Sequence, residues 1–244
     1  MVSYNKKIQG PPMATEDFFK LCKSGTFKEV QVAIKSGVNV NARNEYGVTP
    51  LMFAVEYNED REVIKTLINA GADVNAEDES DKTPLMYASE YCKNEKIVKL
   101  LLRSRAEINA RNKYGEISLM HGAWNANSEI TKLLIQAGAE VNVQDLHGRT
   151  SLMKAAGYNE NAEVIRLLLE AGENVNVADN EGKTSLMYAA ENEENEGKII
   201  IVTMLLEAGA DVNIVDDDGM SALDYAIENN NLELIKVLRS KSGN

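Results

Sequence analysis

The sequence repeats one short motif at nearly constant intervals along its 244 residues. The motif opens with Thr-Pro-Leu-Met or a close variant and closes with Gly-Ala-Asp-Val-Asn or a close variant. The openings, at intervals of 34, 34, 33, 34 and 37 residues, are Thr49, Thr83, Ile117, Thr150, Thr184 and Ser221. The closing asparagines keep the same register and are Asn41, Asn75, Asn109, Asn142, Asn176 and Asn213. A period of this length is typical of a solenoid, in which each unit packs only on its neighbours.

Each unit predicts two short helices. Thr49 can cap the first helix with its hydroxyl, and Pro50 follows at the first helical position, where a missing N–H does no harm. A second helix is predicted over about residues 61–70, and Gly71 can end it in the left-handed conformation. One such helix pair has too little apolar surface to fold alone, so we expect stacked pairs to share one continuous core.

The pattern D-x-x-G-x-T-P-L-x-x-A-A … E-V-x-x-L-L-x-x-G-A-D-V-N-A resembles the ankyrin repeat over about residues 14–240. The resemblance implies an all-α solenoid of antiparallel helix pairs with β-turn fingers at right angles to them. We predict a disordered leader over 1–13 and one ankyrin-repeat domain over 14–244. Its predicted units are a cap (14–43), five internal repeats (44–77, 78–111, 112–144, 145–178, 179–215) and a second cap (216–244).

Composition excludes several classes of protein. Charged residues make up 26% and apolar residues 44% of the chain, which is ordinary for a folded soluble domain, and no apolar run is long enough to cross a membrane. The net charge of −12 disfavours nucleic acid as a partner. The N-terminus lacks an apolar signal-peptide core, and Cys22 and Cys92 lie far apart, so we predict a reduced, cytoplasmic protein.

No residue pattern predicts catalysis, a cofactor or a metal. His121 and His147 fall in adjacent repeats, but without further ligands they make a weak zinc site. The turn 217–219 lacks the alternating ligands of a calcium loop, and the paired acids Glu193 and Glu194 lie in a polar loop. Phosphate-binding loops and nucleophile elbows are absent. We therefore predict that the protein is not an enzyme.

Methionine stands where ankyrin repeats usually carry histidine after Thr-Pro-Leu. The family histidine ties neighbouring loops together through hydrogen bonds, whereas we expect methionine only to pack. A row of this kind could bind a soft metal, but packing between helices is the favoured interpretation. The methionines are Met52, Met86, Met120, Met153 and Met187.

The third repeat breaks its own pattern. Ile117 replaces the capping threonine, Gly122 replaces a helical alanine, and Arg105 takes the position of the terminating glycine just before the repeat. Trp124, the only tryptophan, stands at a variable position of the inner helix. Such a cluster of broken rules marks either a functional region or drift in a tolerant scaffold.

In ankyrin proteins, partners generally bind the concave face that fingertips and inner helices form. Tyr57, Tyr91 and Tyr158 share one position of the repeat, and Trp124 comes one residue before the intervening position, which Asn125 occupies. Exposed tyrosine and tryptophan dominate binding hot spots. The alternative is that these rings pack on neighbouring repeats as scaffold. The candidate partner-binding residues are Tyr46, Tyr57, Tyr91, Arg111, Tyr114, Trp124, His147, Tyr158, Glu181 and Glu191.

Acidic residues gather toward the C-terminus. Residues 179–218 contain eleven acids and two lysines, and the extra residues of the fifth repeat fall in the loop 191–197. We therefore predict a monomeric module that binds a protein or peptide carrying a basic segment beside an apolar or aromatic anchor. The alternative is a self-associating or structural scaffold module within a larger assembly.

Overall fold

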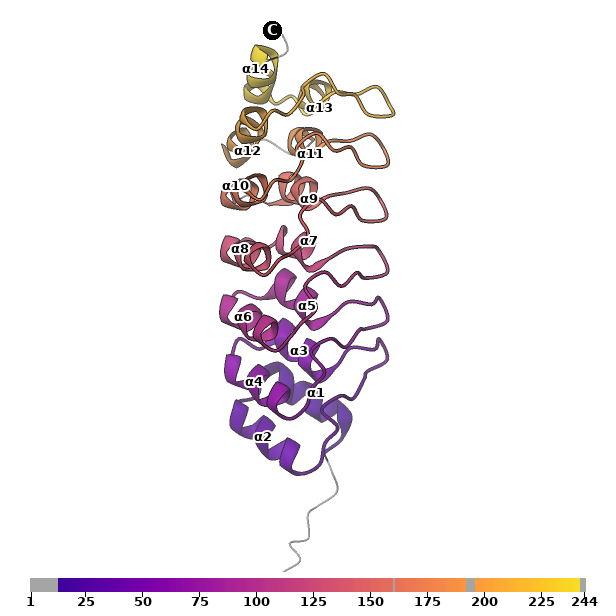
Figure 1. Cartoon of the computed structure of the whole chain (residues 1–244), viewed down its shortest axis with the longest axis vertical. Coiled ribbons are helices and arrows are strands. Elements are labelled where there is room, and N and C mark those ends of the chain that lie inside the picture. The colour runs from indigo at the N-terminus through magenta and orange to yellow at the C-terminus, as the bar shows by residue number, and fades with distance from the viewer. Residues whose placement is uncertain (1–12, 160, 192–195, 242–244) are drawn as a thin grey trace, which may run out of the picture.

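The computed structural model describes residues 13–159, 161–191 and 196–241, and over these residues it contains fourteen helices in seven consecutive pairs. Figure 1 shows the pairs stacked along the long axis, with every finger projecting to the same side. The helices are α1 (Thr15–Ser24), α2 (Phe27–Lys35), α3 (Pro50–Tyr57), α4 (Arg61–Asn69), α5 (Pro84–Tyr91), α6 (Glu95–Arg103), α7 (Ser118–Gly122), α8 (Ser128–Gln136), α9 (Ser151–Tyr158), α10 (Ala162–Glu170), α11 (Ser185–Ala190), α12 (Glu196–Glu207), α13 (Ala222–Glu228) and α14 (Leu232–Lys241).

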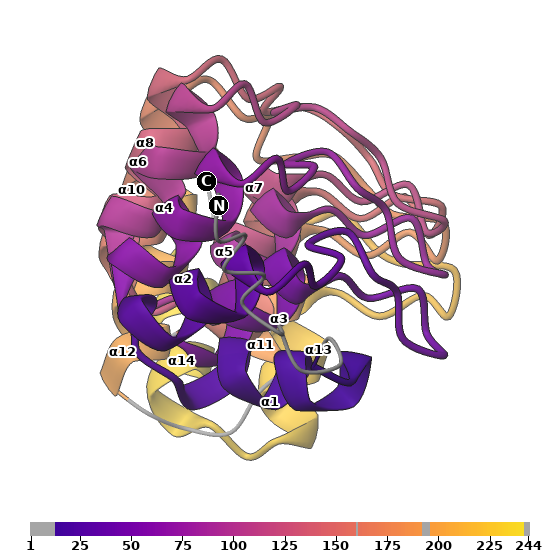
Figure 2. The ribbon, with the colours of Figure 1, turned by 90° about the horizontal axis from the view of Figure 1, so that it is seen from below.

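Each helix pair packs on the next. The odd-numbered inner helices contact one another in order from α1 to α13, and the even-numbered outer helices do the same from α2 to α14. Buried leucines such as Leu51, Leu67 and Leu101 contribute to one core that continues through the stack. Viewed along the stack, the inner helices lie between the outer helices and the fingers (Figure 2). The predicted all-α solenoid is confirmed.

The helix starts follow the predicted capping, with one correction. Thr49 accepts the amide of Met52 at 3.3 Å, and the Met52 sulfur accepts the amide of Thr49 at 3.3 Å. Thr150 and Met153 repeat this exchange at 3.3 and 3.4 Å. The expectation that methionine only packs was therefore wrong, because its thioether is a weak acceptor placed where a capping box needs one.

The closing asparagines join successive units. Asn75 donates from Nδ2 to the carbonyl of Arg105 at 3.2 Å and accepts the amide of Glu107 on Oδ1 at 2.9 Å. The asparagines that reach the following unit in the same two ways are Asn41, Asn109, Asn142 and Asn176. The last one, Asn213, bonds Asp211 within its own turn, and among the described residues it has no bond to a following unit.

The fingers form a ladder of their own. A side-chain oxygen of the first finger residue, such as Asp78, accepts two amides and closes the turn. Neighbouring fingers are then joined by backbone bonds, for example from Glu79 N to Tyr46 O at 3.0 Å and from Leu146 N to Tyr114 O at 2.8 Å. Residues at the fingertips are therefore held at fixed spacing along the stack.

The third repeat is irregular in the way the sequence indicated. Ile117 provides no side-chain cap, and α7 has five residues where α3, α5 and α9 each have eight. Arg105 takes the left-handed φ of 67°. A Cβ on Gly122 would lie 2.8 Å from Leu134 Cδ1, so this glycine lets α8 approach α7 closely.

Candidate functional site

Exposed aromatic residues end the inner helices. Tyr57, Tyr91 and Tyr158 are the last residues of α3, α5 and α9, and 45, 45 and 62% of their surface is exposed. All three therefore stand at the same place in their layers of the stack, and the layer of α7 lies between those of α5 and α9. The prediction that these tyrosines share one position of the repeat is confirmed.

Trp124 belongs to the same line. Asn58 and Asn159 follow Tyr57 and Tyr158, and each donates from Nδ2 to carbonyls at the end of the preceding inner helix. Asn125 does the same toward α5. Because α7 is short, Trp124 is the residue before this amide. From the sequence, Trp124 was placed one residue before the position that the tyrosines share. That placement was wrong, because it assumed that every inner helix has the same length.

We call Tyr57, Tyr91, Trp124 and Tyr158 the helix-end row. The rings of the row contact other side chains of the stack. Lys23 lies 4.4 Å from the centre of the Tyr57 ring, and Lys82 lies 4.8 Å from the centre of the Tyr91 ring. The row thus combines features of the scaffold interpretation and the partner-binding interpretation, because its rings contact other side chains of the stack and still present exposed surface.

Three neighbouring side chains contact the Trp124 ring. Its ring meets that of Tyr158 at right angles with centroids 6.2 Å apart, and meets His121 in the same way at 6.2 Å. Lys154 Nζ lies 4.8 Å from the centre of the Trp124 ring. These contacts fix the ring and leave 37% of the residue exposed.

Two hollows open beside the row. One, of about 430 Å³, is lined by Trp124, Ala126, Tyr158, Asn159 and Asn161. The other, of about 200 Å³, lies between Tyr57 and Tyr91 and is lined also by Val55, Glu56, Asn58, Glu59, Cys92, Lys93 and Asn94. Both are shallow concavities between successive layers.

A buried cluster of charges lies beneath Trp124. Lys154 is 1% exposed, and its Nζ lies 2.7 Å from Glu116 Oε1 and 3.1 Å from Asp145 Oδ2. Toward α5, His121 Nδ1 lies 2.8 Å from Glu90 Oε2. Lys82 Nζ approaches the same Glu90 oxygen at 2.7 Å. This central charge cluster (Lys82, Glu90, Glu116, His121, Asp145 and Lys154) joins three successive layers.

The carboxylates of the cluster stay ionised. Burial by itself would raise the pKa of Glu90, but hydrogen bonds from His121, Lys82 and Tyr91 and the charge of Lys82 lower it to about 2. Burial likewise opposes the hydrogen bonds and charge of Lys154 at Glu116 and Asp145, and the pKa of both is lowered. Each buried cation therefore faces negative charge at neutral pH.

In several repeats, the first residue of the finger pairs with a residue of the inner helix that follows it. Tyr87 donates to Asp78 at 2.8 Å and Tyr188 donates to Asp179 at 2.6 Å, while Lys154 takes the same place opposite Asp145. Phe53, which cannot donate, stands in a repeat whose finger starts with asparagine rather than aspartate. Sequence reasoning missed this match, although the constant spacing of nine residues between aspartate and donor could have indicated it.

The remaining candidate residues lie on the same side of the stack. Tyr46, Tyr114, His147 and Glu181 are exposed at fingertips, and Arg111 is exposed at the base of a finger. Glu191 is exposed at the end of α11 and pairs with Lys183 at 3.0 Å. Residues 192–195 of the predicted acidic loop lie outside the described residues.

The two histidines are not brought together, because His121 is buried in the cluster and His147 is exposed on a finger. Over the described residues, no group of three or more histidine, cysteine or acidic side chains is placed to hold a metal ion. Within the same residues, no helix combines the length and apolar character that crossing a bilayer requires.

The regular layers agree with comparisons to known protein families. A family model described as ankyrin repeats (3 copies) matches residues 18–112 and 119–216, and a second, described as ankyrin repeats (many copies), matches residues 92–135. The chain belongs to the ankyrin repeat family. Ankyrin repeats are generally protein–protein interaction modules. A comparison with curated proteins gave no match.

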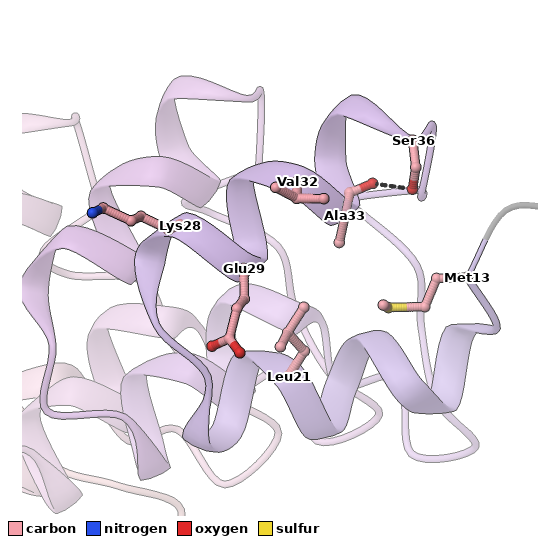
Figure 3. A pocket seen from close by; sticks show the side chains of 7 residues that line it. All are labelled: Met13, Leu21, Lys28, Glu29, Val32, Ala33 and Ser36. Carbon is pink, nitrogen blue, oxygen red and sulfur yellow. Dashed lines mark hydrogen bonds between the residues drawn. The ribbon is translucent and has the colours of Figure 1, made fainter. Parts of the chain in front are cut away.

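A further hollow, of about 450 Å³, lies at the N-terminal end of the ankyrin stack (Figure 3). Glu29 and Ala33 line it, at the α2 positions where α4 carries Val63 and Leu67. Glu29 bonds Thr26 in a capping box instead of inserting into a preceding layer. The hollow is therefore the space left by smaller or polar side chains at the end of the stack, and it needs no ligand to explain it.

Proposed function

We propose that this ankyrin-repeat protein binds a partner protein or peptide along the helix-end row and the adjoining fingertips. The observation that carries the proposal is the line Tyr57, Tyr91, Trp124 and Tyr158, with one exposed ring in each of four successive layers. Tyrosine and tryptophan offer large contact area with few rotatable bonds, so little entropy is lost when a partner covers them.

Charge selects the partner in this proposal. Glu181, Asp217 and Asp218 are exposed on the last fingers, and Glu191 is exposed nearby. Two basic groups of the first three fingers are engaged within the stack, because Arg43 bonds the carbonyl of Glu77 and Lys113 bonds the carbonyl of Glu79. A partner with a basic segment beside an apolar or aromatic anchor would complement this surface, whereas nucleic acid would be repelled.

The remaining features of the proposal follow from the same surface. We propose a monomer with no catalytic role and no cofactor. We also propose a cytoplasmic location, because Cys22 and Cys92 are buried and unpaired, as expected in a reducing compartment. The alternative, a self-associating scaffold, would use exposed apolar residues at the two ends of the stack, such as Val32 and Leu232.

The test starts with capture of partners on the immobilised protein and their identification by mass spectrometry. Calorimetry then compares the affinity of a purified partner for wild type, Trp124→Ala and Tyr91→Ala. We expect each substitution to weaken binding at least about tenfold. Ile200→Ala is the matched control, because this exposed residue lies on outer helix α12, and it should leave affinity within twofold.

Two results would contradict the proposal. One is that both row variants stay folded and bind as tightly as wild type. The other is mass in light scattering that rises with concentration in the absence of any partner, which favours the scaffold alternative.

A further inference from the structure

We propose that the hollow between Trp124 and Tyr158 receives one uncharged, apolar side chain of the partner, and that buried Lys154 positions Trp124 to form its wall. This inference rests on the proposed function and specifies the chemistry of its anchor. It assigns a role to the larger of the two hollows beside the helix-end row.

Two aromatic rings that are held in place form the apolar part of the wall of the hollow. The Trp124 and Tyr158 rings stand perpendicular to each other with centroids 6.2 Å apart, and Ala126 lines the space beside them. A volume of about 430 Å³ is ample for one side chain. Because the rings are already oriented, an entering side chain gains contact without ordering the wall.

The two asparagine side chains that line the hollow are already bonded. Asn159 donates from Nδ2 to the carbonyls of Ala123 and Asn125 at 2.8 and 3.0 Å, and its Oδ1 accepts the amide of Asn161. Asn161 donates to the carbonyl of Ala126 at 2.8 Å, and its Oδ1 accepts the amide of Glu163. Because both asparagine side chains are engaged and the Trp124 and Tyr158 rings offer exposed apolar surface, we expect an apolar side chain to be favoured here.

The charges near the hollow also favour an uncharged side chain. The Trp124 ring already has a cation against it, because Lys154 Nζ lies 4.8 Å from the ring centre. Lys154 and Arg149 together balance Glu116 and Asp145, because Arg149 Nε lies 3.0 Å from Asp145 Oδ2, so these four groups offer no excess negative charge to the hollow. A second cation would compete for the same ring. Complementarity therefore favours a neutral side chain, and the described residues that line the hollow are themselves uncharged.

The smaller hollow provides a contrast within the same chain. Glu56, Glu59 and Lys93 line the space between Tyr57 and Tyr91. That hollow offers charged groups to a partner, while the described residues that line the Trp124–Tyr158 hollow offer none. Tyr57 therefore supplies a control position that is matched in repeat register but differs in chemistry.

Lys154 acts through Trp124. The residue is buried and absent from the lining of the hollow, but its ammonium supports the face of the indole ring. Glu116 and Asp145 hold that ammonium in place at 2.7 and 3.1 Å. Loss of the ammonium would remove one of the three contacts that orient the ring, so we classify Lys154 as a positioning residue.

The single tryptophan makes the hollow directly observable, because the indole N–H gives one isolated signal in a ¹⁵N-correlated NMR spectrum. The probes are N-acetyl-leucinamide and N-acetyl-lysinamide, titrated separately into the full chain. We expect the leucine probe to shift this signal saturably and to bind at least about tenfold more tightly than the lysine probe. Equal or tighter binding of the lysine probe would overturn the inference.

Substitutions test which residues produce the response of the indole signal to the leucine probe. Tyr158→Ala should abolish the response to the leucine probe, and Tyr57→Ala should leave it unchanged. Lys154→Met should broaden the indole signal and weaken the leucine probe about fivefold or more. If Lys154→Met does not fold, the double variant Lys154→Met/Glu116→Gln removes the buried pair together and serves the same test. An unaltered indole signal and probe affinity in either folded variant would show that Lys154 does not position the ring.

The outcome separates this inference from the proposed function. If the leucine probe fails to bind while Trp124→Ala still weakens the partner, the hollow is not the anchor site and the proposed function stands. If the probe binds as expected while the partner ignores Trp124→Ala and Tyr91→Ala, the proposed function fails.

Discussion

Lys154 Nζ lies 2.7 Å from Glu116 Oε1, across the boundary between the layers of α7 and α9. Both residues are buried, at 1 and 8% exposure, and Asp145 completes the contact. Where the repeats of α5 and α11 place tyrosine against aspartate, the repeat of α9 places the charged Lys154 against Asp145, and Lys154 also reaches Glu116 across the boundary. The stack therefore depends on electrostatic pairing at the layer that also carries its only tryptophan.

Substituting Lys154 by alanine should destabilise the protein strongly. The change would leave the buried Glu116 carboxylate without its lysine and Asp145 with Arg149 alone, and removing one partner of a buried ion pair typically costs about 3–5 kcal/mol. Urea unfolding followed by circular dichroism measures the loss. The double variant Lys154→Met/Glu116→Gln should recover part of it, and a double-mutant cycle with no coupling between the two sites would contradict the ion pair.

Asn75→Ala should destabilise the stack more than Asn213→Ala. Asn75 links its unit to the next through two hydrogen bonds, whereas among the described residues Asn213 has no bond to a following unit. Loss of both inter-unit bonds should lower the free energy of unfolding by about 1–3 kcal/mol. Chemical denaturation of the two variants in parallel makes the comparison, and equal losses would show that the asparagine ladder adds nothing to coupling between units.

Arg105→Gly should stabilise the protein by about 1 kcal/mol. Arg105 has a φ of 67°, a conformation that costs a residue with a Cβ about 1–2 kcal/mol and costs glycine little. Gly71 occupies the equivalent position of the preceding repeat at a φ of 91°. Thermal unfolding should show a higher Tm for the variant, and a lower Tm would mean that the arginine side chain makes compensating contacts.

Glu173 should make stability fall as pH rises toward neutrality. Burial raises the pKa of Glu173 from its ordinary 4.5 to about 7, although its Oε1 accepts the amide of Leu152 at 2.8 Å. Between these two values the folded chain retains a proton that the unfolded chain releases. The contribution of Glu173 is therefore fully present below about pH 4.5 and is lost as pH rises through about 7.

The variant Glu173→Gln isolates this effect, because glutamine keeps an acceptor and cannot ionise. We compare the free energy of unfolding of the variant with that of wild type at two pH values. The difference, in favour of the variant, should be about 3 kcal/mol larger at pH 8 than at pH 4. Urea titrations at both values measure the difference. If the difference in free energy of unfolding is the same at pH 4 and pH 8, the folded chain does not raise the pKa of Glu173.

Local sequence signals predicted the layers because each signal acts over a few residues. Thr49, Pro50 and Gly71 begin and end helices through their own backbone preferences, and the left-handed conformation of Arg105 follows from the glycine position that it occupies. Exposure of the candidate residues also followed from repeat register. The same reasoning misplaced Trp124, because the shortening of α7 to five residues cannot be located from spacing alone.

The sequence by itself determined the period, the helix pairs, the turn chemistry and the stacked architecture, because these depend on short-range propensities repeated in register. Only the tertiary structure decided which side chains meet between layers. The pairing of Lys154 with Glu116, the support of Trp124 by that lysine and the engagement of Asn159 and Asn161 join residues from different repeats. Such contacts depend on how neighbouring layers pack, which no single repeat encodes.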